Sequence, residues 1–407
     1  MKNLLVGQSG GPTAVINGSL YGVLTESIRH PESIGRVYGM RNGIEGFLEG
    51  HYVDLTARLS EKEQQALLYT PGAFLGSCRY KLPEELTDPV YPRLFEAFLG
   101  MNIGYVLYIG GNDSMDTVSK LSRYAASVHS DIRFIGIPKT IDNDLVLTDH
   151  TPGFGSAAKY VASTVREICI DASVYHTESV TVVEIMGRNT GWLTAACALA
   201  RRFENDNPVM IFLPETPFDQ EAFLSGVSEQ LRLRKNVTVC VSEGIRDKNG
   251  TFICEYAGAQ GTDAFGHRML TGCGKYLENL IRERLGIKVR SIELNVNQRC
   301  CSGSLSETDL QEAVLAGKKG VLFALDKKTG VMVTFRRTAH SPYAITCQAE
   351  DVGNICNLEK TVPANWITED GSDIKQELKD YLFPLIQGSV TIPMKDGLPD
   401  FAYLEDL

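Results

Sequence analysis

The sequence lacks three features that would place the protein in a zinc-finger, membrane or secreted class. Its ten cysteines form no Cys-x-x-Cys pair, so we expect reduced, mostly buried thiols and no structural zinc site. No stretch approaches the roughly 18 consecutive apolar residues of a membrane helix. Near the amino terminus the only apolar run is Leu4–Val6, far short of a signal-peptide core. These absences favour a cytoplasmic protein.

Excess positive charge is missing as well. Lysine and arginine total 40 against 50 aspartates and glutamates, which gives a formal net charge of -10. Such a surface repels nucleic acid and anionic membranes, so we expect neither as a main partner. A small anionic substrate remains compatible with this charge, because a few converging arginines and lysines set the potential inside a cleft.

What the chain does contain is a repeated pattern of short apolar runs and helical segments. With 407 residues, 43% of them hydrophobic, it is too long for one typical domain. Apolar runs that end abruptly in glycine or polar residues predict buried parallel strands at 4–6, 105–109, 134–137, 180–185, 209–213 and 237–241. Helical patterns, such as those at 157–172 and 266–285, alternate with these strands. The expected fold class is α/β, with two doubly wound, parallel-rich sheets that carry helices on both faces.

The expected domains are 1–155, 156–316 and a carboxyl-terminal extension, 317–407, that packs back on the first two. Within the extension, residues 320–337 resemble a β-hairpin that turns at 327–330. In α/β sheets ligands bind beyond the carboxyl ends of the strands. The unusual residues of this chain gather at such ends.

Two glycine-rich turns follow predicted strands, and each opens a predicted helix. The first is Gly7–Thr13, before a helical pattern at 14–28, and the second is Gly110–Ser114, before 115–124. Glycine amides and the positive end of a helix attract phosphate, so two such turns suit a substrate with two linked phosphates. Tight turns without a ligand are the alternative. Asp113 would repel phosphate unless it holds a metal or excludes another ligand, and its alternative role is a helix N-cap.

A third turn carries the densest charge. Pro138–Asp144 follows the strand predicted at 134–137 and contains Lys139, Asp142 and Asp144. In an extended stretch the two carboxylates point the same way, and their repulsion raises the proton affinity of one, as a general base for a sugar hydroxyl requires. Lys139 can balance phosphoryl charge in the transition state. A solvated turn is the alternative, but it does not need so many ionisable groups.

The second half of the chain has its own polar side chains at strand ends. Arg188 and Glu243 each follow a predicted strand, and these residue types bind phosphate and sugar hydroxyls respectively. Arg290 and Arg299 flank a further apparent strand at 291–296, where both could meet a terminal phosphate. A single surface arginine is commonly just solvated, so these residues become candidates only through their convergence at strand ends.

In this order, the segments resemble the phosphofructokinase family, and specifically its pyrophosphate-dependent branch. The resemblance covers about residues 1–320 and rests on Ser9-Gly10-Gly11, Gly72-Ala73-Phe74-Leu75-Gly76-Ser77 with Arg79, Gly110-Gly111-Asn112-Asp113-Ser114, Pro138 to Asp144, Met186-Gly187-Arg188, Ser242-Glu243-Gly244 and Gln298-Arg299. Asp263-Ala264-Phe265-Gly266-His267 and the tail are similar to the longer bacterial pyrophosphate enzymes.

The resemblance implies an activity, a cofactor and a set of site residues. The activity is transfer of a phosphoryl group from pyrophosphate to the 1-hydroxyl of fructose 6-phosphate, with Mg²⁺ as cofactor. Catalytic roles fall to Asp142 as the base, Lys139 and Asp113. Donor-binding residues would be Gly10, Gly11, Arg79, Gly111, Asn112, Asp113, Ser114 and Lys139. Acceptor-binding residues would be Thr140, Ile141, Asp142, Met186, Gly187, Arg188, Glu243, Arg290, Val296 and Arg299. Metal ligands would be Asn112, Asp113 and Asp144.

Two positions indicate the donor. ATP-dependent members of the family have glycine where Asp113 and Lys139 stand. If Asp113 occupies the place of a nucleotide α-phosphate, two negative charges about 4 Å apart repel by roughly 4 kcal/mol at an effective dielectric near 20. That repulsion is on the order of a thousandfold against ATP. Lys139, in contrast, suits a compact pyrophosphate.

Three positions depart from the family pattern. Asn112 stands where an aspartate usually binds the metal, so Mg²⁺ could instead bind through Asp113, Asp144 or water. Ser179 replaces a sugar-phosphate arginine of the ATP enzymes, and Val296 replaces a histidine or tyrosine. These last two changes leave sedoheptulose 7-phosphate open as another acceptor.

The resemblance leaves two other functions open and implies an oligomer. One alternative is an ATP-dependent 6-phosphofructokinase, and the other is a non-catalytic regulatory subunit that binds sugar phosphates as signals. The presence of Asp142 and Lys139 disfavours the regulatory subunit. Family members place residues of two subunits around one active site, so a homodimer or homotetramer is expected.

Overall fold

The computed structural model describes residues 1–257 and 272–404, which form two compact units. Unit 1 contains 1–156, 299–359 and 387–407, and unit 2 contains 157–298 and 360–386. This division differs from the expected domains at the carboxyl-terminal end, where 317–407 is shared between the units and does not form a piece of its own. The motif at 263–267 and the first part of the helix expected at 266–285 lie outside the described residues.

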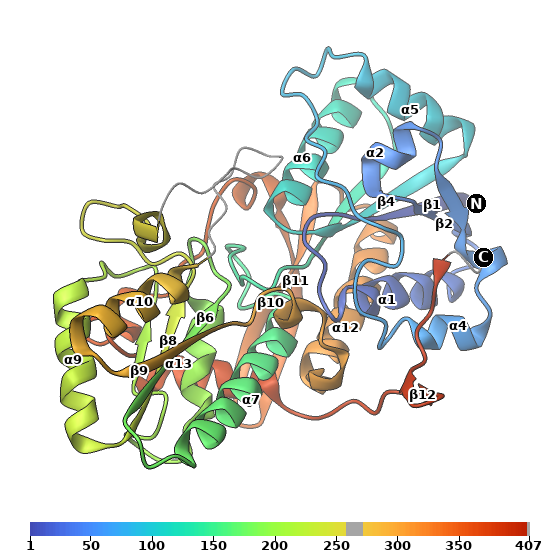
Figure 1. Ribbon diagram of the computed structural model, residues 1–407. Coiled ribbons are helices and arrows are strands. Elements are labelled where there is room, and N and C mark those ends of the chain that lie inside the picture. Colours follow the sequence, from blue (N-terminus) through green and yellow to red (C-terminus); the bar gives the residue numbers. More distant parts are fainter. Residues whose placement is uncertain (258–271, 405–407) are drawn as a thin grey trace. The chain divides into compact units, whose positions relative to one another are not determined.

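Unit 1 is built on a mixed sheet with helices on both faces (Figure 1). Its strands are β1 (Lys2–Gln8), β2 (Ile34–Met40), β3 (Tyr52–Asp54), β4 (Ile103–Gly110), β5 (Arg133–Pro138), β10 (Val331–His340), β11 (Tyr343–Asp351) and the small pair β12 (Met394–Lys395) and β13 (Leu398–Pro399). Its helices are α1 (Ile16–Ile28), α2 (Gly43–Leu48), α3 (Leu55–Arg58), α4 (Glu61–Ala66), α5 (Val90–Gly100), α6 (Asn112–Ser127), η3 (Ser302–Ser304), α12 (Glu307–Leu325) and η4 (Val352–Asn354).

The sheet of unit 1 runs in the order β11-β10-β5-β4-β1-β2-β3. Neighbours from β10 to β2 are parallel, whereas β3 and β11 are antiparallel edges. Alternation along a strand sends successive side chains to opposite faces. Leu4 and Val6 therefore pack with α1 and α12, while Leu5 packs with α5 and α6. The parallel strands predicted at 4–6, 105–109 and 134–137 are confirmed.

The prediction of a hairpin at 320–337 is wrong, because residues 307–325 form the helix α12. The hairpin of this region is β10–β11, in which His340 lies opposite Tyr343. Two glycines lie at the contact between α12 and α1. A Cβ on Gly317 would lie 2.1 Å from the Ser19 carbonyl oxygen of α1, and one on Gly22 would lie 2.2 Å from the Val314 carbonyl oxygen. Glycine is needed there because α1 and α12 pack backbone to backbone.

Unit 2 holds a second, parallel sheet in the order β7-β8-β6-β9. Its elements are α7 (Phe154–Ser173), which begins in unit 1, β6 (Ser179–Ile185), α8 (Trp192–Ala195), η1 (Ala196–Ala200), β7 (Met210–Phe212), α9 (Gln220–Leu233), β8 (Asn236–Ser242), η2 (Ile253–Ala257), α10 (Cys273–Leu285), β9 (Lys288–Glu293), α11 (Asn297–Cys300), which ends in unit 1, η5 (Ala364–Trp366), α13 (Gln376–Leu382) and η6 (Phe383–Ile386). Val180, Val182 and Val239 pack with α9 and α10. With this second sheet, the predicted α/β class is confirmed.

Two further expectations concern membrane spans and cysteines. Across residues 1–257 and 272–404, no helix combines the length and the apolar character needed to cross a bilayer. All ten cysteines are free thiols, and five of them, including Cys240 and Cys273, are buried. The sequence predicts that most of the thiols are buried, whereas half of them are.

Candidate active site

The three predicted turns meet at one edge of the sheet of unit 1, because β1, β4 and β5 are adjacent parallel strands. The Ser9 amide donates to the Ile109 carbonyl at 3.0 Å, and the Lys139 amide donates to the Gly110 carbonyl at 3.0 Å. The hydroxyls of Ser9 and Ser114 are hydrogen-bonded to each other. Backbone and side-chain bonds thus join all three turns into one surface beyond the carboxyl ends of the strands.

Cationic side chains approach the first glycine turn closely. The Lys139 ammonium donates to the Gly11 carbonyl oxygen at 2.5 Å. Gly10 has a φ of 76°, a conformation that favours glycine, and a Cβ there would lie 3.4 Å from the Lys139 Nζ. A Cβ on Gly11 would lie 3.3 Å from the Arg299 Nη1. Arg299, expected on the acceptor side, therefore lies beside the donor turn within unit 1.

Lys139 has a strongly perturbed pKa at this surface. Its side chain is buried, and burial lowers the pKa of the ammonium to about 8, although Asp142 and Asp144 act to raise it. Arg299 and Arg79 lower the pKa further. Two carboxylates and two guanidinium groups thus lie close enough to Lys139 to shift its pKa. Such a mixture of fixed charges suits stabilisation of a phosphoryl group in transfer.

The expectation that Thr140–Asp144 is extended is wrong. Asn143 has a φ of 55°, and the Asp142 amide donates to the Thr140 hydroxyl at 3.0 Å, so the segment forms a turn. Ile141 is buried. Because the backbone turns between them, Asp142 and Asp144 do not follow the alternation of a strand, and strand geometry gives no reason for one to raise the other's proton affinity. The polar side chains nevertheless stay beside Lys139.

Asp113 lies at the exposed rim of the second glycine turn. Helix α6 begins at Asn112 and its N-cap is Gly111, so the alternative role of Asp113 as the cap is not adopted. The Asp113 carboxylate lies 3.1 Å from the Lys81 ammonium, and both side chains are exposed. Sequence reasoning missed Lys81, although it stands only two residues after Arg79, which was assigned to the donor. Lys81 offsets part of the negative charge that Asp113 presents.

Asn112, predicted as a metal and donor ligand, has another partner. Its amide nitrogen donates to the Leu358 carbonyl at 2.5 Å, and its amide oxygen accepts from the Asn357 amide at 2.5 Å. The Asn357 side chain in turn lies 3.5 Å from Asp116. Both ends of the Asn112 amide therefore bind the segment that follows η4, a contact between residues about 245 positions apart that no sequence motif announced.

In unit 2, the segments after β6 and β8 pack together at the carboxyl ends of adjacent strands. The Gly187 amide donates to the Glu243 carboxylate at 3.3 Å, and the Glu243 amide donates to the Ile185 carbonyl at 2.8 Å. A Cβ on Gly244 would lie 2.0 Å from the Arg188 carbonyl oxygen. The structure thus brings together Gly187, Arg188 and Glu243 as predicted.

Gln298 and Glu184 complete this surface of unit 2, although neither was among the predicted ligands. The buried Gln298 side chain accepts a bond from the Met186 amide at 3.2 Å and so fixes the start of the Met-Gly-Arg segment. Burial raises the pKa of Glu184 to about 7, although a bond from the Gly274 amide opposes that rise. Burial likewise raises the pKa of Glu243, opposed by the Gly187 amide.

Arg290 lies away from the strand ends that carry this group. Arg290 is inside β9, opposite Thr181 and so short of the carboxyl end of the strand, where its guanidinium lies 3.9 Å from Asp171. The expectation that Arg290 precedes the strand is therefore wrong, because β9 begins at Lys288. Val296 is exposed and follows Asn295, which has a φ of 46°.

Known proteins similar to this chain agree on one family. The family model described as phosphofructokinase matches residues 3–323. A Halomonas elongata protein named pyrophosphate--fructose 6-phosphate 1-phosphotransferase is 41% identical over 99% of this chain and 96% of its own length. A Methylococcus capsulatus protein of the same name is also 41% identical with the same coverage. The crystal structure of a pyrophosphate-dependent phosphofructokinase from Nitrosospira multiformis superposes with a TM-score of 0.91, at 37% identity, over 100% of this chain and 97% of that one.

Proposed function

The chain belongs to the phosphofructokinase family, and from this premise we propose that it transfers a phosphoryl group from pyrophosphate to the 1-hydroxyl of fructose 6-phosphate. The products are fructose 1,6-bisphosphate and phosphate, and the reaction is readily reversible. The observation that carries the proposal is the buried Lys139 ammonium beside the Gly10–Gly11 turn, in the field of Arg79, Arg299 and two aspartates. Relatives that match almost the full chain are named for the same donor and acceptor.

The proposed donor side lies in unit 1. Gly10, Gly11 and Gly111 let backbone amides approach a pyrophosphate, and the amino terminus of α6 adds a partial positive charge. Asp142 takes the proton from the sugar 1-hydroxyl, whose oxygen forms a bond to the nearer phosphorus while the bridging P–O bond breaks. Lys139, with Arg79 and Arg299, stabilises the charge that develops on the leaving phosphate.

The proposed acceptor side includes residues of unit 2. Arg188 offers a guanidinium fork that matches a phosphate group, and Glu243 accepts hydrogen bonds from sugar hydroxyls. The bond from the Gly187 amide to Glu243 and the close approach of Gly244 to the Arg188 backbone keep these two residues together at the ends of neighbouring strands. Arg290 and Val296 remain proposed acceptor residues from the family resemblance.

Magnesium is part of the proposal. Within the described residues, no three or more His, Cys, Asp or Glu side chains surround a common metal position. Mg²⁺ does not need such a cage, because it keeps several waters and binds through one or two carboxylates together with substrate phosphates. Asp144 and Asp113 provide the oxygen ligands it prefers, and they would hold it at the donor phosphates. The ion would supply positive charge there, whereas Asn112 is committed to residues 357–358.

A coupled assay of fructose 6-phosphate with pyrophosphate, ATP and Mg²⁺ varied separately tests this function. We expect turnover with pyrophosphate, little with ATP, and a loss on the order of 10²–10⁴-fold in kcat for Asp142→Ser, because the general base is removed.

The Asp113→Gly variant should use ATP better than the wild type does. The gain in rate should be smaller than the full charge repulsion would give, because Lys81 already offsets part of the Asp113 charge. Turnover with ATP and none with pyrophosphate would refute the proposed donor.

The proposal also covers the compartment and the assembly state of the enzyme. We propose that the enzyme works in the cytoplasm, where the ten free thiols would stay reduced. The resemblance to enzymes that share active-site residues between subunits supports a homodimer or homotetramer. Light scattering of the purified protein at assay concentration would distinguish these two states from a monomer.

A further inference from the structure

A buried histidine, His150, belongs to a hydrogen-bond network that the proposed mechanism does not use. It stands six residues after Asp144, the last residue of the turn at 140–144 (the catalytic turn), and its side chain is 1% exposed. Its Nδ1 lies 2.8 Å from an oxygen of Asp149, and its Nε2 lies 2.6 Å from an oxygen of Glu312 in α12. Because a neutral imidazole has one donor, two carboxylate partners can both be satisfied only by the doubly protonated imidazolium.

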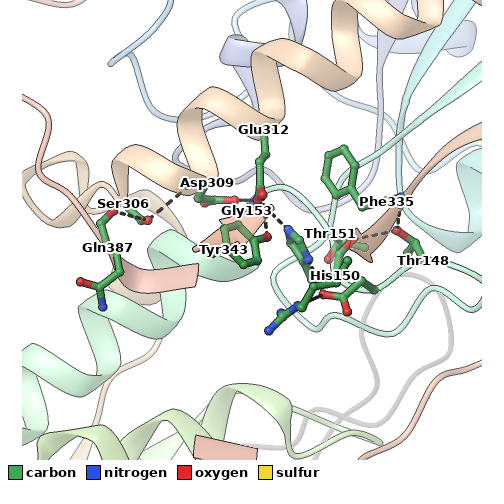
Figure 2. Close-up of polar contacts among 12 residues, drawn as sticks. Thr148, His150, Thr151, Gly153, Ser306, Asp309, Glu312, Phe335, Tyr343 and Gln387 are labelled. Atoms are coloured by element: carbon green, nitrogen blue, oxygen red, sulfur yellow. Dashed lines mark hydrogen bonds and ion pairs between the residues drawn. The ribbon is translucent and has the colours of Figure 1, made fainter. Parts of the chain in front are cut away.

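The groups around His150 come from each element that packs against it. Figure 2 shows Glu312, His150 and Tyr343 pointing toward one another. The Tyr343 hydroxyl of β11 donates to Glu312 at 2.7 Å, and the Arg337 guanidinium of β10 donates to Asp149 at 2.9 Å. The Phe335 ring lies 5.1 Å from the imidazole. The two carboxylates therefore face two cations, and loss of the histidine proton would leave a buried, uncompensated negative charge.

Asp309 is a further titratable group on α12 that faces the segment 150–156. Its carboxylate accepts from the Gly153 amide at 2.9 Å and from the Ser156 amide at 2.8 Å. It is buried, and burial raises the pKa of its carboxyl to about 6, although the bonds from Ser156 and Gly153 oppose that rise. Asp309 and Glu312 thus attach the segment 150–156 to α12 at two points one helical turn apart.

The same segment is bonded directly to the catalytic turn. The Thr151 hydroxyl donates to the Thr140 carbonyl at 2.9 Å, and the Thr140 amide donates to the Pro152 carbonyl at 3.2 Å. On its other side, the Thr148 hydroxyl accepts from the Phe335 amide at 2.9 Å. Residues 140–144 and the return segment, 148–156, are therefore bonded to each other, and the return segment is bonded in turn to α12 and to the β10–β11 hairpin.

We propose that His150 is a positioning residue. As an imidazolium that donates to Asp149 and Glu312, it fixes the return segment, 148–156, and thereby positions Asp142 relative to Lys139. This inference rests on the proposed phosphotransferase function. Its physical basis is that Thr140, adjacent to the reacting groups, makes two hydrogen bonds to the segment that the histidine holds, one from the Thr151 hydroxyl and one to the Pro152 carbonyl. A shift of about 1 Å at reacting groups costs on the order of 10²-fold in rate.

The test compares the full-length enzyme with its His150→Gln variant, in which residue 150 no longer offers a positive charge to Asp149 and Glu312. We expect kcat per folded enzyme to fall by at least about tenfold, while the KM values for pyrophosphate and fructose 6-phosphate change less than about threefold, since an interaction used only in the transition state lowers kcat. Amide hydrogen exchange should increase within residues 139–153. Adding Glu312→Gln to His150→Gln should restore part of kcat, because the second change removes the uncompensated charge.

His51→Gln is the matched control, because it removes an exposed histidine whose carboxylate partner, Glu49, is exposed too. It should leave both kcat and exchange unchanged. If His150→Gln does not fold, Tyr343→Phe and Glu312→Gln provide the same comparison, with a larger loss of kcat expected for Glu312→Gln. Unchanged kcat and unchanged exchange at 139–153 in the folded variants would overturn the proposal.

A wild-type enzyme without pyrophosphate-dependent turnover would defeat the proposed function instead, while hydrogen exchange would still test the network. An NMR titration of the histidines in the wild-type protein gives a further independent readout. We expect one imidazole to stay protonated well above neutral pH and to be the signal that His150→Gln removes. Deprotonation of that imidazole below pH 7 would exclude the imidazolium.

Discussion

At the scale of single residues, Lys139 shows how burial converts an ordinary side chain into a responsive one. Burial lowers the pKa of the ammonium to about 8, with Asp142 and Asp144 opposing the shift and Arg299 and Arg79 adding to it. The group is therefore charged at neutral pH and loses its charge only slightly above it. A cation that stabilises a leaving phosphate must stay protonated, so the lysine limits the pH range of the reaction.

We predict that kcat with pyrophosphate falls as pH rises through about 8, because Lys139 loses its proton there. Lys139→Arg should lower the maximal rate, since a planar guanidinium does not fit the place of a compact ammonium, but should extend the active range to higher pH, since arginine stays charged. Rate profiles from pH 6 to 10 measure this. Lys62→Arg, at an exposed ion pair with Asp400, is the control, and an identical alkaline limb in wild type and Lys139→Arg would contradict the assignment.

At the scale of secondary-structure elements, the position of a glycine decides how two strand ends fit together. The segments after β6 and β8 approach so closely that a Cβ on Gly244 would lie 2.0 Å from the Arg188 carbonyl oxygen and 2.6 Å from that of Gly187. Both contacts are with backbone, which cannot move aside as a flexible side chain can. The Ser-Glu-Gly motif therefore ends in glycine because Met-Gly-Arg occupies the adjoining space.

We predict that Gly244→Ala weakens the acceptor side specifically. Overpacking of this kind typically costs about 1–3 kcal/mol, and here it would displace Arg188 from Glu243. The KM for fructose 6-phosphate should rise about tenfold or more, while the KM for pyrophosphate changes little, because the donor turns belong to unit 1. Steady-state kinetics with each substrate varied measure the difference. Gly100→Ala, where no atom would lie within 4 Å of the new Cβ, is the control.

At the scale of the whole molecule, buried ion pairs in each unit link stability to pH. In unit 1, burial would raise the pKa of Asp149, but bonds from His150 and Arg337 lower it to about 2. In unit 2, burial would raise the pKa of Glu278, but bonds from Lys275, Ser291 and Arg282 lower it to about 2. Burial would lower the pKa of His150, but Glu312 and Asp149 raise it to about 9.

These shifts predict a stability maximum between about pH 5 and 7. Depressed carboxyl groups contribute stability that is present above their unfolded pKa of about 4 and lost as pH falls toward 2. The raised histidine contributes stability that is complete below about 6.5 and lost as pH rises through 9. Urea unfolding from pH 3 to 10 measures the profile. Glu278→Gln should flatten the acid side, and a stability that keeps rising from pH 7 to 10 would contradict the contribution of His150.

The sequence by itself determined the strands that carry the donor site and the turns at their ends. Apolar runs stop at glycine because buried parallel strands end where the chain turns to the surface, so the turns after β1, β4 and β5 could be assigned locally. The residue types there, Lys139, Asp142 and Asp113, followed from the chemistry of phosphate. The same reasoning failed at residues 320–325, which were expected to begin a hairpin but continue the helix α12.

Only the tertiary structure decided which distant groups act on those turns. Lys81 pairs with Asp113, residues 357–358 engage Asn112, and His150 meets Glu312 across 162 positions of the chain. Local sequence does not predict such partners, because ion pairs and hydrogen bonds between distant segments depend on how the strands are ordered in the sheet. The burial that lowers the pKa of Lys139 and the carboxylates that raise the pKa of His150 arise in the same way, from packing that many separate segments create together.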